Sequence, residues 1–222
     1  MQAHAIIPTV ELLTALGITG LALGLAAPAA QAAPPSAAEA LVHRIEERHR
    51  NLRDLTARFV QTYRSGVLGR EVSERGTVSI KPPGRMLWEY REPEKKTFVS
   101  DGKTFYFYVP ADRQVIVREQ AGERGILSRL LSGQEILGQF EAGLETAASG
   151  RPRVRLTPRR PDPDVDRVYL EADEHDHISQ LEIVDVQGNR SLFRFEGIRE
   201  NLGLSDRIFH FDVPRGVEVV SG

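Results

Sequence analysis

Residues 81 to 114 have the sequence K-P-P-G-R-M-L-W-E-Y-R-E-P-E-K-K-T-F-V-S-D-G-K-T-F-Y-F-Y-V-P-A-D-R-Q. Two turn signals divide this stretch into short strands. Pro83-Gly84 fits the central positions of a type II turn, because proline presets φ and glycine supplies the positive φ. Asp101-Gly102 is a second hairpin signal, and the β-branched and aromatic residues around it suit a pleated, half-buried surface. The stretch therefore predicts consecutive hairpins and offers few catalytic residue types.

The two-residue period of strands recurs through most of the chain. Further strands are expected at residues 56–63, 72–80, 154–156, 168–170, 181–184 and 192–195. A capping box at Ser36 and Glu39 predicts a helix that ends near Asn51. Short helices are expected at residues 125–131 and 135–140. Many strands joined by short turns predict one antiparallel, strongly curved sheet with few helices.

The first 32 residues differ in composition from the rest. Residues 12–32 are rich in Leu, Ala and Gly and end in Ala30-Gln31-Ala32, which is typical of a secretory signal with its cleavage site. The glycines and a proline in this run make a membrane span the less favoured interpretation. We therefore expect a signal peptide at residues 1–32 and a single domain at residues 33–222.

Charge and cysteine content exclude several function classes. Loss of residues 1–32 removes one acid, Glu11, and leaves 29 bases against 30 acids. A net charge of −1 gives no electrostatic basis for a nucleic-acid partner. The chain has no cysteine, which excludes a disulfide framework, a thiolate nucleophile and a lipidated N-terminal cysteine.

Several segments of the chain form one ordered set. They are L-T-A-R-F-V-Q-T-Y at 55–63, P-G-R-M-L-W-E-Y at 83–90, S-D-G-K-T-F-Y-F-Y-V-P at 100–110, Gln114 and F-H-F-D-V-P-R-G-V at 209–217. Together these segments resemble the LolA family of periplasmic lipoprotein carriers. The resemblance implies a mainly β fold, an incompletely closed antiparallel β-barrel whose short helices cover the concave face as a lid.

The same resemblance implies a function. We expect a monomeric, non-enzymatic periplasmic chaperone without cofactors that carries acylated lipoproteins from the inner to the outer membrane. Its partners would be an inner-membrane lipoprotein-releasing transporter and an outer-membrane acceptor. The alternative is a carrier or sensor of other lipids or glycolipids on the same fold, and a third hypothesis is an envelope hydrolase. Copurifying cargo separates the first two, and an esterase assay tests the third.

Aromatic residues at strand spacing are either ordinary core or the lining of a ligand cavity. The resemblance favours the cavity for Phe59, Met86 and Trp88. The expected acyl-chain cavity comprises Phe59, Val78, Ile80, Met86, Trp88, Tyr90, Phe105, Phe107, Leu127 and Leu131.

One position departs from the family pattern. LolA-like proteins carry an arginine just before the hairpin proline, where it fastens the lid, and this chain has Pro82 there. Arg85 is a candidate lid latch, because a turn centred on Pro83-Gly84 brings it close to Pro82 and its donors would reach helix carbonyls near residues 131–133. The alternative is an exposed hairpin arginine, since consecutive residues of a strand point to opposite faces and Arg85 is therefore on the other face from Met86.

No motif for catalysis or metal binding is strong. Asp173-Glu174-His175-Asp176-His177 would suit a divalent ion, but a polar turn is expected between the two apolar runs that flank it, so we favour a solvated turn and no metal. His49 is expected to be a packed or solvated surface residue. The nucleophile-elbow, dinucleotide and Walker motifs do not occur in the sequence.

The N-terminal pattern predicts that the protein is exported and cleaved between Ala32 and Ala33. N-terminal sequencing of the periplasmic protein is expected to begin at Ala33. An intact Met1 on membrane-bound protein would contradict both the cleavage and the soluble state.

Overall fold

A computed structural model describes residues 34–119, 130–131, 135–147 and 149–221. Residues from Pro35 onward form one compact unit. The expected signal peptide at residues 1–32 lies outside the described residues. None of the helices in the described part of the chain has the length and hydropathy needed to cross a membrane.

The described residues form a large sheet, one longer helix and shorter helical segments. The helical elements are α1 (Ala37–Arg50), α3 (Ile136–Gln139) and the 3₁₀-helix η1 (Asp206–Phe209). The strands are β1 (Leu55–Arg64), β2 (Glu71–Lys81), β3 (Arg85–Glu92), β4 (Lys96–Asp101), β5 (Thr104–Val109), β6 (Gln114–Glu119), β7 (Phe140–Thr146), β8 (Pro152–Pro158), β9 (Arg167–Ala172), β10 (Ile178–Val184), β11 (Arg190–Glu200) and β12 (Glu218–Ser221).

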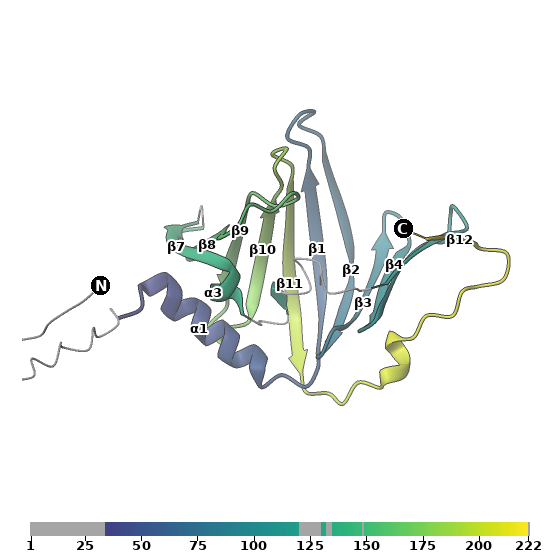
Figure 1. Ribbon diagram of the computed structural model, residues 1–222, viewed down its shortest axis with the longest axis horizontal. Helices are drawn as coiled ribbons and strands as arrows, with labels where there is room; N and C mark the ends of the chain where they lie inside the picture. Colours follow the sequence, from purple (N-terminus) through teal and green to yellow (C-terminus); the bar gives the residue numbers. More distant parts are fainter. Residues whose placement is uncertain (1–33, 120–129, 132–134, 148, 222) are drawn as a thin grey trace, which may run out of the picture. The chain divides into compact units, whose positions relative to one another are not determined.

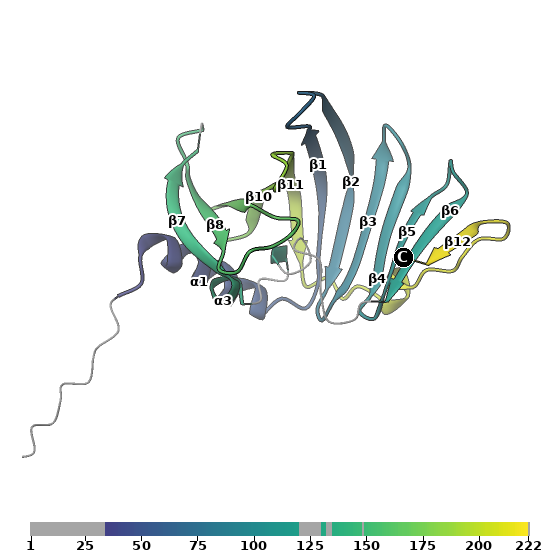
Figure 2. The ribbon, with the colours of Figure 1, turned by 45° about the horizontal axis from the view of Figure 1, so that its top comes forward.

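All twelve described strands belong to one open, curved sheet (Figures 1 and 2). Their order is β12-β6-β5-β4-β3-β2-β1-β11-β10-β9-β8-β7, so the two edges, β12 and β7, are not paired with each other. The expected incompletely closed β fold with few helices is confirmed. One detail differs, because β12 runs parallel to β6 while the other pairs are antiparallel.

Helix α1 begins where the sequence predicts. Ser36 Oγ accepts from the Glu39 amide and the Glu39 carboxylate accepts from the Ser36 amide, so the capping box is complete. Val42 and Ile45 lie one turn apart on the buried side of the helix. They join a core cluster with Val154 on β8 and other residues of one sheet face, which we call the inner face.

The opposite, outer face of β3 to β6 is covered by the C-terminal segment, residues 201–217. Its helix η1 packs against β3 and β4, and Phe209 is fully buried. The Phe211 ring lies 5.4 Å from that of Tyr106 and 5.5 Å from that of Tyr108. This contact explains why β5 is apolar on both faces, since its tyrosines pack outward and Phe105 and Phe107 face inward.

The predicted hairpins are present, but the first turn is not the expected type II turn. Lys81 pairs with Arg85, so three residues, Pro82, Pro83 and Gly84, form the loop, and the Pro82-Pro83 peptide bond is cis. The second hairpin joins β4 and β5 around Asp101-Gly102, with Gly102 at φ +96°.

Asp54 fixes the C-terminal segment to the start of β1. Its carboxylate is buried and accepts the backbone amides of Leu202 at 2.7 Å, Gly203 at 2.9 Å and Leu204 at 3.0 Å. These residues are about 150 positions away along the chain, and the bonds direct the segment toward the outer face.

Replacement of Asp54 by alanine is expected to lower the free energy of unfolding by about 3 kcal/mol, because three buried amides lose a charged acceptor. Urea unfolding measures the change. Asp185→Ala is the matched control, since Asp185 also accepts two amides, but in a more exposed turn, and its removal is expected to cost less. Equal losses in the two variants would contradict the role given to Asp54.

His49 is buried on the inner side of α1. The prediction of a packed histidine is therefore confirmed, and the alternative of a solvated histidine is wrong. Its Nδ1 lies 2.8 Å from the Ile45 carbonyl oxygen, to which it donates. Burial lowers the pKa of His49 below its ordinary value, and the bond to Ile45 offsets only part of this effect.

This lowered pKa predicts a pH-dependent stability. The unfolded state takes up the proton first, so the contribution of neutral His49 is complete above about pH 6.5 and is lost as the pH falls below that value. His49→Gln retains a donor for the Ile45 carbonyl and does not titrate. We expect urea unfolding between pH 7 and pH 5 to show a smaller loss of stability in this variant than in the wild type, and equal losses would refute the assignment.

Candidate functional site

The centre of the inner face is an aromatic cluster. The Phe59 ring on β1 lies 4.9 Å from both Trp88 and Tyr90 on β3, in edge-to-face geometry. Trp88 lies 5.5 Å from Phe193 and 6.1 Å from Phe195 on β11. The cluster therefore joins strands on both sides of β1.

Tyr90 is the polar member of this cluster. Its hydroxyl donates to Gln61 Oε1 at 2.6 Å, and the Lys96 ammonium lies 4.4 Å from its ring centroid. Burial, with a smaller effect from the Glu74 carboxylate, raises the pKa of Tyr90 well above its ordinary range. The phenol is thus a neutral hydrogen-bond donor and is no candidate for a general base.

One row of directly opposed residues crosses six strands of the inner face, β1 to β6. It runs from Ala57 through Val78, Trp88, Phe98 and Phe107 to Ile116. The first three are fully buried, and the last three are only half-buried. Together with Phe105, the half-buried members Phe98, Phe107 and Ile116 form what we call the inner aromatic strip.

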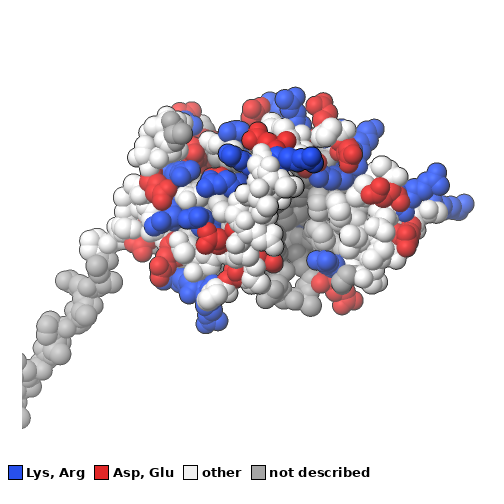
Figure 3. Space-filling view, turned by 90° about the horizontal axis from the view of Figure 1, so that it is seen from above, with Lys and Arg blue, Asp and Glu red and all other residues white. Residues whose placement is uncertain are grey.

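The strip is a half-covered part of the inner face. The Phe98 and Phe107 rings stack with their centroids 4.2 Å apart, and Phe105 lies 5.8 Å from Phe98. On the side of β3 to β6, Figure 3 shows a surface of mostly uncharged residues, with charged side chains around its rim. Such a surface offers apolar contact area to a ligand.

Under α1 the inner face is nearly filled. A cavity of about 20 Å³ lies between His49 on the helix, Leu131, and Val78 and Ile80 on β2. This volume holds about one water molecule and is too small for an acyl chain.

The predicted cavity residues fall into four groups. Val78, Ile80 and Leu131 line the small cavity, Phe59, Met86, Trp88 and Tyr90 are buried core, Phe105 and Phe107 belong to the strip, and Leu127 lies outside the described residues. Met86 is 8 % exposed, so it is packed into the core in this conformation.

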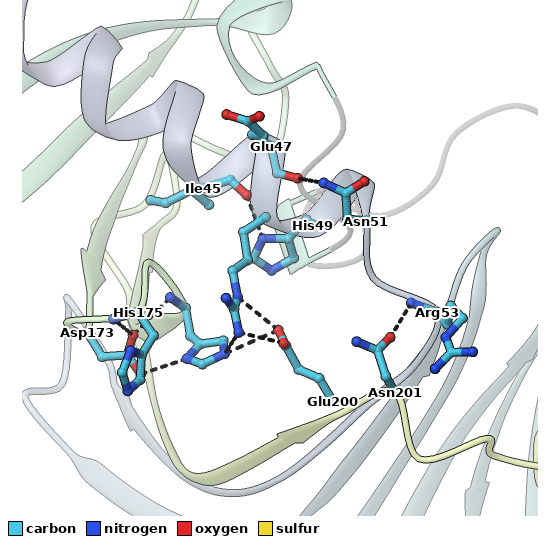
Figure 4. Close-up of polar contacts among 11 residues, drawn as sticks. Ile45, Glu47, His49, Asn51, Arg53, Asp173, His175, Glu200 and Asn201 are labelled. Atoms are coloured by element: carbon cyan, nitrogen blue, oxygen red, sulfur yellow. Dashed lines mark hydrogen bonds and ion pairs between the residues drawn. The ribbon is translucent and has the colours of Figure 1, made fainter.

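A polar network attaches α1 to the end of β11 and to the turn between β9 and β10 (Figure 4). Arg48 binds Glu200 through two nitrogens, at 3.3 and 2.6 Å, and its Nη2 lies 2.9 Å from His177 Nε2. His177 Nδ1 lies 2.8 Å from Asp173 Oδ2, so the tautomer that satisfies both contacts donates to Asp173 and accepts from Arg48. A second ion pair joins Arg44 to Asp176 at 3.1 Å. We call these six residues the Arg48 network.

The Arg48 network changes the interpretation of residues 173–177. The segment is the expected turn, but His177 is buried rather than solvated. The guanidinium of Arg48 stands where a cation would approach His177. Among the described residues, no group of three or more His, Asp or Glu side chains is placed to hold a metal ion.

Arg85 contacts the C-terminal segment. Its Nη2 lies 3.7 Å from Asp206 Oδ2, and Lys81 Nζ lies 2.6 Å from Asp206 Oδ1. The carbonyls proposed as latch acceptors include residues 132 and 133, which lie outside the described residues. The latch stays a prediction, and the described contacts attach Arg85 to η1 on the outer face.

Sequence reasoning missed three aromatic residues of this face, Phe98, Phe193 and Phe195. The alternation in Leu192-Phe193-Arg194-Phe195 marks a strand with one aromatic face, and this signal could have found the last two. Phe98 had the same parity signal through its pairing with Trp88. The side chains that converge here are apolar or already paired, so the arrangement suits binding of an apolar ligand.

Comparison with known proteins agrees with this geometry. The family described as "Outer membrane lipoprotein carrier protein LolA" matches residues 50–212. An outer-membrane lipoprotein carrier protein of Hahella chejuensis is 29% identical over 177 residues, which cover 77% of this chain and 83% of the relative. One from Dechloromonas aromatica is 31% identical over 173 residues, with 77% and 83% covered.

Among solved structures, an uncharacterized conserved protein from Thermus thermophilus superposes with a TM-score of 0.51 at 16% sequence identity, over 84% of this chain and 100% of that one. This likeness concerns the fold alone. With the family match over most of its length and relatives at about 30% identity, the chain belongs to the LolA family of outer membrane lipoprotein carrier proteins.

Proposed function

We propose that the protein is a periplasmic carrier that shields the acyl chains of lipoproteins on its inner face and moves them from the inner to the outer membrane. The observation that carries the proposal is the cross-strand row from Ala57 to Ile116, apolar throughout and half-exposed at Phe98, Phe107 and Ile116. The names of the relatives support the lipoprotein cargo.

Acyl chains need such a surface to cross water. Each buried CH₂ contributes about 0.8 kcal/mol to lipid association with an apolar phase, so a diacylated or triacylated protein does not leave a bilayer readily without a shield. The inner aromatic strip supplies the first contact area. The cavity under α1 is too small for a chain, so deeper binding requires α1 or the segment that carries Leu131 to move away from β2.

The remaining parts of the proposal rest on the family and on the composition. We infer that the protein is a monomer, that it catalyses no reaction, and that it exchanges cargo with an inner-membrane transporter and an outer-membrane acceptor. Because this chain has Pro82 in place of the family arginine, the alternative cargo is a different lipid or glycolipid. Mass spectrometry of ligand retained by native periplasmic protein decides this, because acylated polypeptide and free lipid differ in mass.

Replacement of Phe107 by glutamate is expected to reduce the retained acylated cargo at least about tenfold, since bound chains would bury an unpaired carboxylate. Circular dichroism and thermal unfolding are expected to show a folded protein, because Phe107 is only half-buried. Val213→Glu is the control, an exposed apolar residue in the C-terminal segment, and it is expected to retain cargo normally. Normal cargo retention in a folded Phe107→Glu protein would count against the strip as the binding surface.

A further inference from the structure

Among the large apolar residues that the structure describes, the two with the highest exposed fractions lie at the tip of the β1–β2 hairpin. Val67 is 83% exposed and Leu68 is 71% exposed, and no described residue covers them. In Figure 1 this hairpin projects beyond its neighbours, beside the turn that joins β10 to β11. Val186, in the turn that joins β10 to β11, is also exposed. We call Val67, Leu68 and Val186 the apolar tip.

The tip is held in place by hydrogen bonds and close packing. The Gly66 amide donates to Asn189 Oδ1 at 3.0 Å, and a Cβ on Gly66 would lie 2.6 Å from the Gly188 carbonyl oxygen. Asn189 in turn donates to Asp185 Oδ2 at 2.7 Å. The β1–β2 turn and the β10–β11 turn are therefore fixed to each other, and Val67, Leu68 and Val186 project from backbone that is held in place.

Arginines stand at the base of the tip. Arg64 and Arg70 flank the loop at the ends of β1 and β2, and both are exposed. Within the part of the chain that the structure describes, neither guanidinium has an ion-pair partner. Glu71 lies opposite Arg64 in the strand register. Asp185 is occupied by the amides of its own turn. Two free guanidinium groups beneath two exposed aliphatic side chains match a phosphate headgroup layer above an acyl layer.

Two exposed apolar residues lie next to the tip. Tyr63 has the same strand parity as Phe59 and lies opposite Val72 on β2. Both Tyr63 and Val72 are exposed, between the aromatic cluster and the tip. Gln61 and Glu74, the next opposed pair on this face, separate these two residues from the aromatic cluster. Tyr63 and Val72 therefore extend the apolar surface of the tip and not that of the core.

We propose that the apolar tip inserts into the surface of a phospholipid bilayer with anionic headgroups and sets the open part of the inner face beside the membrane. Val67 and Leu68 enter the acyl boundary, Arg64 and Arg70 bind headgroup phosphates, and Tyr63 and Val72 widen the apolar surface that meets the bilayer. The use of this placement for cargo rests on the proposed carrier function, whereas the membrane contact itself does not.

Flotation with vesicles of mixed phosphatidylethanolamine and phosphatidylglycerol tests the contact, using protein recovered from the periplasm. The wild type is expected to float with the vesicles, and Val67→Asp with Leu68→Asp is expected to bind at least about tenfold more weakly. Arg64→Gln with Arg70→Gln is expected to remove the preference over phosphatidylcholine vesicles. Val219→Asp, an exposed valine on β12, is the matched control and is expected to bind normally.

A wild type that does not float, or tip variants that float equally well, would overturn the proposal. Tip variants that float normally but fail to deliver cargo to outer-membrane proteins would overturn it too, and would assign the tip to a protein partner.

Binding of a fluorescent tripalmitoylated lipopeptide, without vesicles, separates this proposal from the carrier function. The tip variants are expected to bind the lipopeptide like the wild type, because the inner aromatic strip is intact. If the wild type itself fails to bind the lipopeptide, the carrier function fails while the flotation result stands.

Discussion

The packing of Phe59 against Gly76 is the constraint on which the inner face depends. The two residues are directly opposed on β1 and β2, and a Cβ at position 76 would overlap the Glu89 carbonyl and lie 2.9 Å from Phe59 Cε1. Glycine leaves room for the Phe59 ring at the middle of the sheet, where it contacts Trp88 and Tyr90 on one side and faces Phe193 on the other. A larger residue would force the ring, and with it the aromatic cluster, out of the inner face.

From this centre the two halves of the sheet are completed in different ways. Beyond β11 the inner face is closed by α1, which is fixed at its C-terminal end by the Arg48 network. Toward β6 the cover lies on the outer face, where Phe209 and Phe211 of the C-terminal segment pack. The inner face of β4 to β6 is consequently left half-exposed. A carrier benefits from this division, because one half supplies stability and the other offers apolar surface to a ligand.

Local signals were enough to predict most of this fold. The capping box, the hairpin at Asp101-Gly102 and the parity of Met86, Trp88 and Tyr90 are set by neighbouring residues, and all are present. The parallel β12 and the bonds from Asp54 to residues about 150 positions later were not predicted, because their partners carry no local pattern. The site was harder for a related reason. Parity tells which residues share a face but not how deeply each one is covered. Trp88 is buried against aromatic rings of β1 and β11, some of them distant in the sequence, whereas Phe107 stays half-exposed.

The Arg48 network bears on how the closed half opens. Arg48, Glu200, His177 and Asp173 are partly shielded and mutually bonded, so separating one member would leave charged groups without partners in a poorly hydrated place. Leu131 borders the small cavity together with apolar residues of β1 and β2, and acyl CH₂ groups of a bound ligand would replace these contacts directly. Opening from the side of Leu131, with the C-terminal end of α1 still attached to β11, would therefore cost less than lifting the whole helix. A chain that first lies on Phe98 and Phe107 would then advance along the cross-strand row toward Val78, and each step would exchange one apolar contact for another.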